Sequence, residues 1–118
     1  MPFQKILTDV VSSVDGAVAA LFVDRHGETV QIVGDLPSWD MKVIGAYQGI
    51  FLTRLEAACS TYDQEPPHRL KVEWERSLIL NQAVDDEYYL VLVLRSGSNE
   101  GLAWRALGKG RELLLEEM

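Results

Sequence analysis

Apolar residues follow two different spacings in different segments of the chain, and these spacings predict its secondary structure. Apolar side chains recur every three or four positions over residues 3–14, 39–60 and 99–114, which is typical of helices with a buried face. Over residues 70–74 the period is two, because every other residue is charged. This segment is therefore predicted to be a half-buried strand.

Two other segments, residues 17–23 and 88–94, are apolar at nearly every position. Continuous apolar runs of this length are typical of central strands that are covered on both faces. Residues 29–33 and 78–84 are predicted to be the remaining strands. We expect Gly27 to adopt a positive φ in the turn that precedes the first of these two.

The predicted order of elements is helix, strand, strand, helix, strand, strand, strand, helix. Short turns between consecutive strands indicate a five-stranded antiparallel sheet. Two of the strands are apolar on both faces, so helices should cover both sides of this sheet. The sequence thus predicts an α/β (α+β) fold in a single domain spanning residues 1–118.

Composition and charge exclude several classes of partner. The formal charge is −7, whereas binding a nucleic acid backbone requires clustered Lys and Arg. Cys59 is the only cysteine, so no internal disulfide forms, and a reducing cytoplasm is the simplest location. No apolar run approaches the roughly 20 residues that span a bilayer. We therefore expect a cytoplasmic protein that neither binds nucleic acid nor inserts into membranes.

The helix predicted at residues 39–60 has apolar residues on two sides. The side expected to face the core carries Met41, Ile44, Gln48, Phe51, Leu52, Leu55, Ala58 and Cys59. The opposite side carries Val43, Ala46, Ile50, Thr53 and Ala57. A helix that covers a sheet in a monomer has charged residues on its outer side, so a second chain or domain should cover this one. We predict a dimer interface formed by this outer side together with Leu70, Val72 and Trp74.

Two alternatives to this interface remain open. Ala46, Gly49, Thr53 and Ala57 form a row of small residues, which suits either helix packing between chains or close packing of the helix on its own sheet. The mixed charges of residues 70–74 are typical of an edge strand, which can pair with its own copy. An ordinary solvated strand has the same pattern.

Candidate catalytic and metal-binding groups are weak. No phosphate-binding loop of the G-x-x-x-x-G-K-[ST] type is present. Asp24, His26 and Glu28 alternate in a predicted turn, where side chains generally point into solvent. The acidic residues 85–87 lack the other oxygen ligands of a calcium loop, and Cys59 lies at a core position of its helix. The sequence therefore predicts no enzyme activity, no metal and no cofactor.

Three segments carry a resemblance to a known family. They are the hairpin VDGAVAALFVDRHGETVQIVG, the helix MKVIGAYQGIFLTRL, and the closing strand and helix YYLVLVLRSGSNEGLAWRALGKG. Together they resemble the Roadblock (dynein light-chain) family, and within it the bacterial MglB type. The resemblance covers nearly the whole chain and rests on residue classes, not on catalytic signatures.

This resemblance implies a profilin-like sheet with one helix on one face and two on the other. It also implies homo- or heterodimers in which the second helices lie antiparallel and the third strands join the two sheets. Many members bind or regulate small Ras-like GTPases, and MglB-type dimers act as GTPase-activating partners. Other members tether dynein or lysosomal signalling complexes. The family offers no catalytic residue to assign here.

The sequence thus favours a non-catalytic homodimer that binds and regulates a small Ras-like GTPase. The predicted partner-binding residues are Trp39, Lys42, Tyr47, Arg54 and Glu56. Arg54 lies in the middle of a helix, which argues against its acting as an arginine finger. One alternative is a scaffold dimer that recruits a kinase or motor complex. Another is a small-molecule sensor, which the absence of polar residues in segments 17–23 and 90–94 disfavours.

Overall fold

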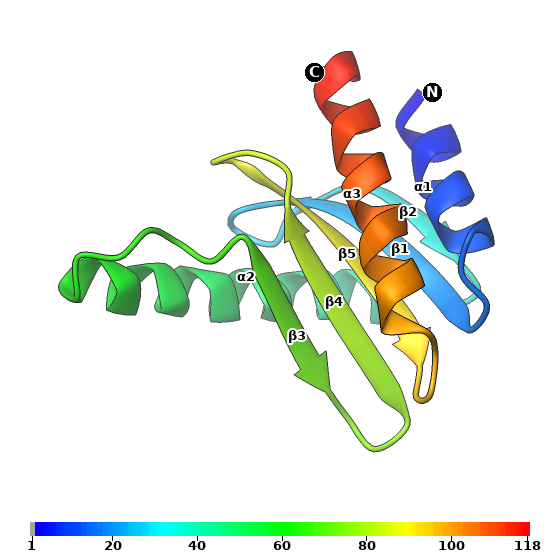
Figure 1. Cartoon of the computed structure of the whole chain (residues 1–118), viewed down its shortest axis with the longest axis horizontal. Helices are drawn as coiled ribbons and strands as arrows, with labels where there is room; N and C mark the ends of the chain where they lie inside the picture. The colour runs from blue at the N-terminus through cyan, green and yellow to red at the C-terminus, as the bar shows by residue number, and fades with distance from the viewer. Residues whose placement is uncertain (1) are drawn as a thin grey trace.

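The computed structural model describes residues 2–118, apart from the side chains of Ser38 and Trp39. Its three helices and five strands follow the order expected from the sequence (Figure 1). The elements are α1 (Pro2–Ser12), β1 (Ala17–Asp24), β2 (Thr29–Gly34), α2 (Ser38–Thr61), β3 (Arg69–Glu73), β4 (Ser77–Ala83), β5 (Tyr88–Arg95) and α3 (Glu100–Glu117).

All five strands form one antiparallel sheet in the order β2-β1-β5-β4-β3. The apolar runs of β1 and β5 lie side by side near its centre, and most of their residues are buried. The prediction of interior strands that are covered on both faces is therefore confirmed. The strand with alternating charges, β3, lies at one edge of the sheet.

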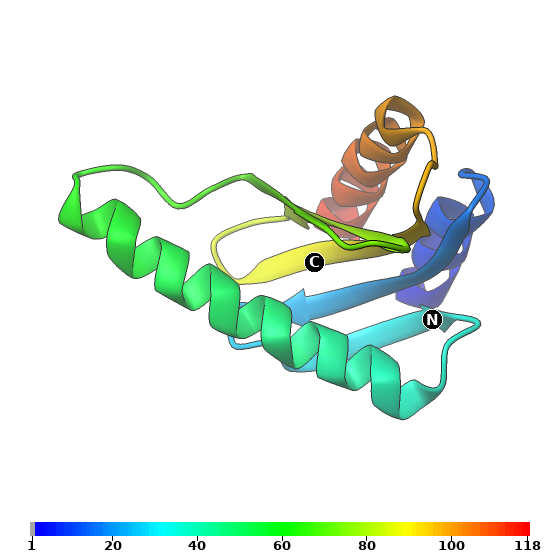
Figure 2. The ribbon, with the colours of Figure 1, turned by 90° about the horizontal axis from the view of Figure 1, so that it is seen from below.

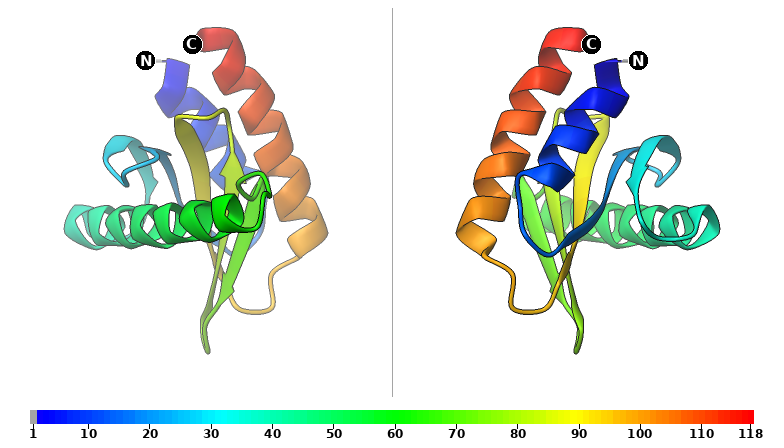
Figure 3. Two further views of the ribbon diagram at one scale, coloured as in Figure 1. Left: turned by 90° about the vertical axis from the view of Figure 1, so that its left-hand side faces the viewer. Right: turned by 90° about the vertical axis from the view of Figure 1, so that its right-hand side faces the viewer.

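The helices divide between the two faces as the resemblance implies. On one face, α1 and α3 lie next to each other (Figure 3) and enclose a core that includes Leu7, Phe22 and Leu107. On the other face, α2 runs alone across the sheet (Figure 2). It encloses a second core that includes Leu21 and Val91.

The β1–β2 turn packs tightly against α2. The Asp24 carboxylate accepts hydrogen bonds from the backbone N–H groups of His26 and Glu28, both at 2.9 Å, and Gly27 has a φ of 85°. A Cβ placed on Gly49 would lie 2.6 Å from the Cα of Gly27. A Cβ placed on Gly27 would lie 2.7 Å from the carbonyl oxygen of Gly45. Gly45 and Gly49 therefore let the β1–β2 turn of the same chain pack directly against the backbone of α2.

This contact divides the row of small residues on α2. Gly49 is buried against the hairpin, whereas Ala46, Thr53 and Ala57 are exposed. For Gly49 the hypothesis of packing between chains is wrong, and the alternative of packing within the chain is correct. The exposed members of the row stay available to a partner.

The core side of α2 is narrower than the sequence predicts. Met41, Gln48 and Leu52 are buried, but Phe51 is 39% exposed and Leu55 is 36% exposed. Their assignment to the core is therefore wrong, as is that of Ala58, which is also exposed. The reason is that α2 packs mainly against β1 and β2 and its last turns extend beyond the sheet (Figures 1 and 2). The flank of the helix that faces β3 is left open.

Candidate protein interaction surface

An apolar groove lies between the open flank of α2 and the edge of the sheet. It has a volume of about 260 Å³ and is lined by Val43, Ile44, Tyr47, Gln48, Phe51, Trp74 and Ile79. Two of its large side chains are more than half exposed, Tyr47 at 58% and Trp74 at 55%. Soluble monomers rarely expose large contiguous apolar patches, so this groove is the candidate interaction surface of the described chain.

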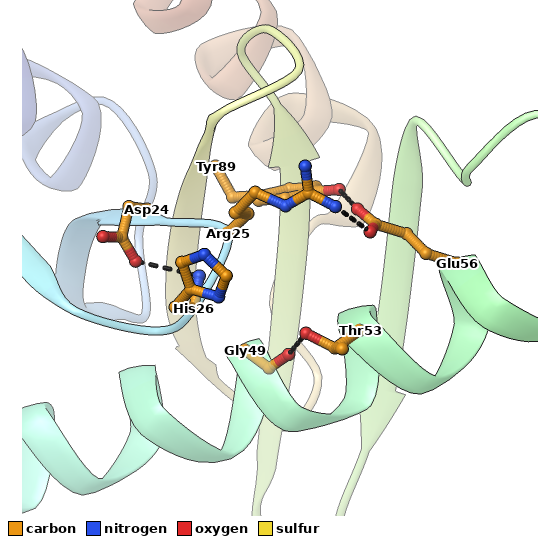
Figure 4. Close-up of polar contacts among 7 residues, drawn as sticks. All are labelled: Asp24, Arg25, His26, Gly49, Thr53, Glu56 and Tyr89. Carbon is orange, nitrogen blue, oxygen red and sulfur yellow. Dashed lines mark hydrogen bonds and ion pairs between the residues drawn. The ribbon is translucent and has the colours of Figure 1, made fainter.

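The predicted interface residues lie on two adjoining parts of this surface. Ala46, Ile50, Thr53 and Ala57 are exposed along the outer side of α2. The Thr53 hydroxyl donates to the Gly49 carbonyl oxygen at 2.8 Å, so its polar group is satisfied within the helix (Figure 4). Val43 lines the groove.

The predicted residues of β3 continue the same surface. Leu70 and Val72 are partly buried and pack against the core beneath α2, and Trp74 lines the groove itself. Sequence reasoning missed Phe51 and Leu55, which it placed in the core. The structure adds both to the apolar flank of α2.

Gln48, which lines the groove, belongs to a buried amide pair. Asn81 of β4 is 1% exposed and Gln48 of α2 is 2% exposed. The Nδ2 of Asn81 donates to the Oε1 of Gln48 at 2.7 Å and, over a longer distance of 3.4 Å, to the carbonyl oxygen of Leu70. This bond ties α2 to β4, and it satisfies two buried amides that need partners. Among the described residues, the Oδ1 of Asn81 has no partner.

An ion pair fixes the second half of α2. The Nη2 of Arg25, in the β1–β2 turn, lies 2.6 Å from the Oε2 of Glu56, whose side chain is only 17% exposed (Figure 4). The Tyr89 hydroxyl donates a long hydrogen bond of 3.5 Å to the Oε1 of Glu56. Burial, and then the adjacent Glu56 carboxylate, raises the pKa of Tyr89 above its ordinary value. The Arg25 backbone N–H also donates to the Glu87 carbonyl oxygen at 2.8 Å.

The predicted partner-binding residues therefore do not form one cluster. Lys42, Tyr47 and Arg54 are exposed along α2. Glu56 lies apart from them, with its carboxylate engaged by Arg25 and Tyr89. The side chain of Trp39 is outside the described part of the structure.

Other chemistry is sparse in the described residues. No group of three or more His, Cys, Asp or Glu side chains among them is placed to hold a metal ion. Within residues 2–118, no helix combines the length and hydropathy that crossing a membrane requires.

Comparisons with known proteins identify the fold. Neither a family model nor a curated protein sequence matches the chain. Solved structures do match it. A Roadblock/LC7 domain from Streptomyces avermitilis has a TM-score of 0.89 at 11% identity, over 97% of this chain and 95% of that one. An MglB structure described as having a tetrameric arrangement has a TM-score of 0.82 at 17% identity, over 93% and 82%.

MglC from Myxococcus xanthus is similar over the full length of both chains, 100% and 100%, with a TM-score of 0.70 and 25% identity. These structures share the layers and the element order derived above. The chain has the Roadblock fold, in the form seen in MglB and MglC, as the resemblance in its sequence predicts.

Proposed function

We propose that this chain is a cytoplasmic, non-catalytic dimer that binds and regulates a small Ras-like GTPase. The observation that carries the proposal is the apolar flank of α2, which no part of the described chain covers. The tetrameric arrangement of the similar MglB structure supports self-association of this fold. The Roadblock fold supports a regulatory role exerted through protein contacts.

A second helix is proposed to cover the groove beside α2. The helix α2 lies nearest to β1 and β2, and the groove stays open on its other flank, toward Trp74 at the β3 edge. Tyr47, Phe51 and Trp74 border this groove. A partner helix there would bury large apolar side chains at about 25 cal/mol for each Å² removed from water. In this proposal, dimerisation covers the apolar groove that the monomer leaves open.

The outer side of the paired helices is the proposed contact with the GTPase. Tyr47 and Arg54 are exposed there, and Tyr and Arg are residue types that anchor protein interfaces. Lys42 and Trp39 lie in the first turns of the same helix. Arg54 projects from the middle of a continuous helix, so we assign it a binding role and not the insertion of a catalytic guanidinium. An effect on hydrolysis would arise from contacts that reshape the GTPase.

The test uses purified Ras-like GTPases encoded in the same genome, each loaded with GTP or GDP. We expect binding that depends on the nucleotide. Binding should be at least tenfold weaker for Tyr47→Ala at concentrations where light scattering shows this variant to be dimeric, since loss of an anchoring aromatic typically costs about 1.4 kcal/mol or more. Arg105→Ala, an exposed residue of α3 on the opposite face of the sheet, is the matched control and should bind normally. A stable dimer that binds none of these GTPases would refute the proposal and favour the scaffold alternative.

A further inference from the structure

The strand β2 forms one edge of the sheet, and this edge carries no charged residue. Its six residues read TVQIVG, and none of them is fully buried. The strand at the opposite edge, β3, reads RLKVE and has a charge at every second position. Proteins commonly protect an exposed edge from other chains by charged side chains or proline. β2 has neither, so its free edge is open to an added strand.

The pairing of β2 with β1 shows which backbone groups of β2 are free. Asp35 N–H donates to the Val18 carbonyl oxygen at 3.0 Å, and the register is regular from there back to Gln31. Residues bonded to one neighbour alternate along an antiparallel strand, so the odd-numbered residues of this stretch bond to β1. The N–H and C=O groups of Ile32 and Gly34 therefore point away from β1, towards the open edge.

One of these free groups is weakly satisfied within the chain. The side-chain Nε2 of Gln31 donates to the Ile32 carbonyl oxygen at 3.5 Å, which is long for a hydrogen bond. A backbone N–H of an added strand would meet the same oxygen at about 2.9 Å. The Gln31 amide is partly exposed and can turn to water instead, so strand addition would replace a poor hydrogen bond by a good one.

An apolar pocket opens beside the start of β2. It has a volume of about 320 Å³ and is lined by Phe3, Phe22, Val30, Tyr88 and Met118. Val30 is 45% exposed and forms the wall nearest the free edge. Phe22 belongs to the core beneath α1 and α3 and is the cross-strand neighbour of Gln31. A large side chain placed opposite Gln31 on an added strand would therefore point to the same face and reach this pocket beside Val30.

The charges around this edge favour a basic partner. Glu28 precedes β2 and Asp35 follows it, and both are exposed. Glu116 and Glu117 are exposed next to Met118, which lines the pocket. The whole chain has a formal charge of −7. A second copy joined along β2 would bring the same carboxylates to this edge again, whereas a segment with basic ends would complement them.

We infer that β2 is a docking edge for an extended peptide segment of another protein, apolar at its centre and basic at its ends. The segment would run antiparallel to β2, form backbone hydrogen bonds with Ile32 and Gly34, and insert one large apolar side chain beside Val30. Backbone bonds give such a complex its affinity, and alternate side chains give it specificity. The inference does not rest on the proposed dimer, because β2 and the groove next to Trp74 lie at opposite edges of the sheet.

A seven-residue probe peptide, KTVTVFK, tests the pairing. Antiparallel addition places its two valines opposite Gly34 and Ile32 and its phenylalanine opposite Gln31. The measurement is amide hydrogen exchange followed by NMR, with and without the peptide. The amides of Ile32 and Gly34 should become protected when the peptide binds. The amides of Gln31 and Val33 should change little, because they already bond to β1.

Variants of the peptide separate the backbone from the side chains. N-methylation of both valines blocks the amides that face β2 and should weaken binding at least about tenfold. N-methylation of both threonines blocks amides on the outer side of the added strand and should have little effect. Replacement of the phenylalanine by serine, or of both lysines by glutamate, should weaken binding at least about fivefold.

Val30→Ser tests the pocket from the side of the protein. Val30 is already exposed, so the variant should keep the fold, which thermal unfolding checks. Loss of this apolar wall should weaken binding of KTVTVFK about fivefold. Leu102→Ser is the matched control, since Leu102 is an exposed apolar residue at the other end of α3 from Met118. This control should bind the peptide normally.

Each outcome decides one part of the inference. No saturable binding of KTVTVFK up to about 1 mM, or binding without protection of Ile32 and Gly34, would refute strand addition. Binding that is insensitive both to Val30→Ser and to loss of the phenylalanine would refute the pocket. Protection of the two amides that rises with protein concentration, without peptide, would make a second copy the occupant and refute the proposed partner. A chain that pairs with KTVTVFK and binds no GTPase would refute the proposed function alone.

Discussion

Replacing Gly49 with alanine tests whether the β1–β2 turn packs against α2 as described. Alanine favours a helix over glycine by about 1 kcal/mol, so without a clash the variant should be more stable than the parent protein. The new Cβ, however, would lie 2.5 Å from the N and 2.6 Å from the Cα of Gly27. Both are backbone atoms, which cannot rotate away as the end of a flexible side chain would.

Overpacking of this kind costs about 1–3 kcal/mol, and the backbone contact favours the upper part of that range. After subtraction of the helix gain, we expect Gly49→Ala to lose about 1–2 kcal/mol of unfolding free energy. Gly108 is a matched control in α3, because a Cβ there would meet nothing within 4 Å. Gly108→Ala should gain about 1 kcal/mol.

The assay is urea and thermal unfolding at one protein concentration, since dimerisation makes the melting temperature depend on concentration. The two variants should melt about 10 °C apart, with Gly108→Ala the more stable. Equal stabilisation by both substitutions would show that the hairpin does not contact Gly49. The small residues of α2 would then again be available as a contact between chains.

Three other predictions follow from the same geometry. Phe51→Asp should give a monomer that keeps most of its unfolding free energy, because this side chain is already partly exposed; light scattering and thermal unfolding measure the two effects. The raised pKa of Tyr89 means that the unfolded chain releases this proton first as the pH rises above about 10. Unfolding free energy should therefore fall through that range, and Tyr89→Phe should reduce the fall in urea titrations. Arg54→Ala should weaken GTPase binding at most about tenfold, roughly 1.4 kcal/mol, and leave the saturated single-turnover rate nearly unchanged; a thousandfold slower rate with intact binding would make Arg54 catalytic.

The sequence predicted the architecture because each layer has its own local signature. The unbroken apolar runs at residues 17–23 and 88–94 required cover on both faces, and these segments became the central strands β1 and β5. The alternating charges of residues 70–74 suited both an edge strand and an ordinary solvated strand, and the structure places β3 at an edge. These signals are local in the chain, so one sequence was enough to read them.

Phe51 and Leu55 were wrongly predicted to be buried in the core. The reason is that helical periodicity gives only the direction in which a side chain points around the helix axis. It does not say how far the helix is displaced across a sheet. A helix of 24 residues is about 36 Å long, whereas five strands span about 19 Å between their outer axes. This difference between the length of the helix and the width of the sheet could have indicated that some turns of α2 would extend beyond the sheet.

Pairings between distant segments could not be read from the sequence. Gln48 was correctly placed toward the core, but nothing in the pattern indicated Asn81 as its partner. Glu56 was assigned to partner binding because it flanks the outer side of the helix. Its ion pair with Arg25 depends on how the hairpin turn meets α2, which only the tertiary structure shows.

The contacts on the inner side of α2 explain how an exposed flank keeps a defined shape. Three of them lie along the helix: Gln48 with Asn81, Gly49 with the hairpin turn, and Glu56 with Arg25. Two of these contacts reach the β1–β2 turn and the third reaches β4, so together they oppose rotation and sliding of the helix on the sheet. A partner that meets a preformed groove loses less free energy in ordering it. These inner contacts hold α2 at a fixed distance from β3 and so set the width of the groove. They support binding in this way even though the binding residues of the groove take no part in most of them.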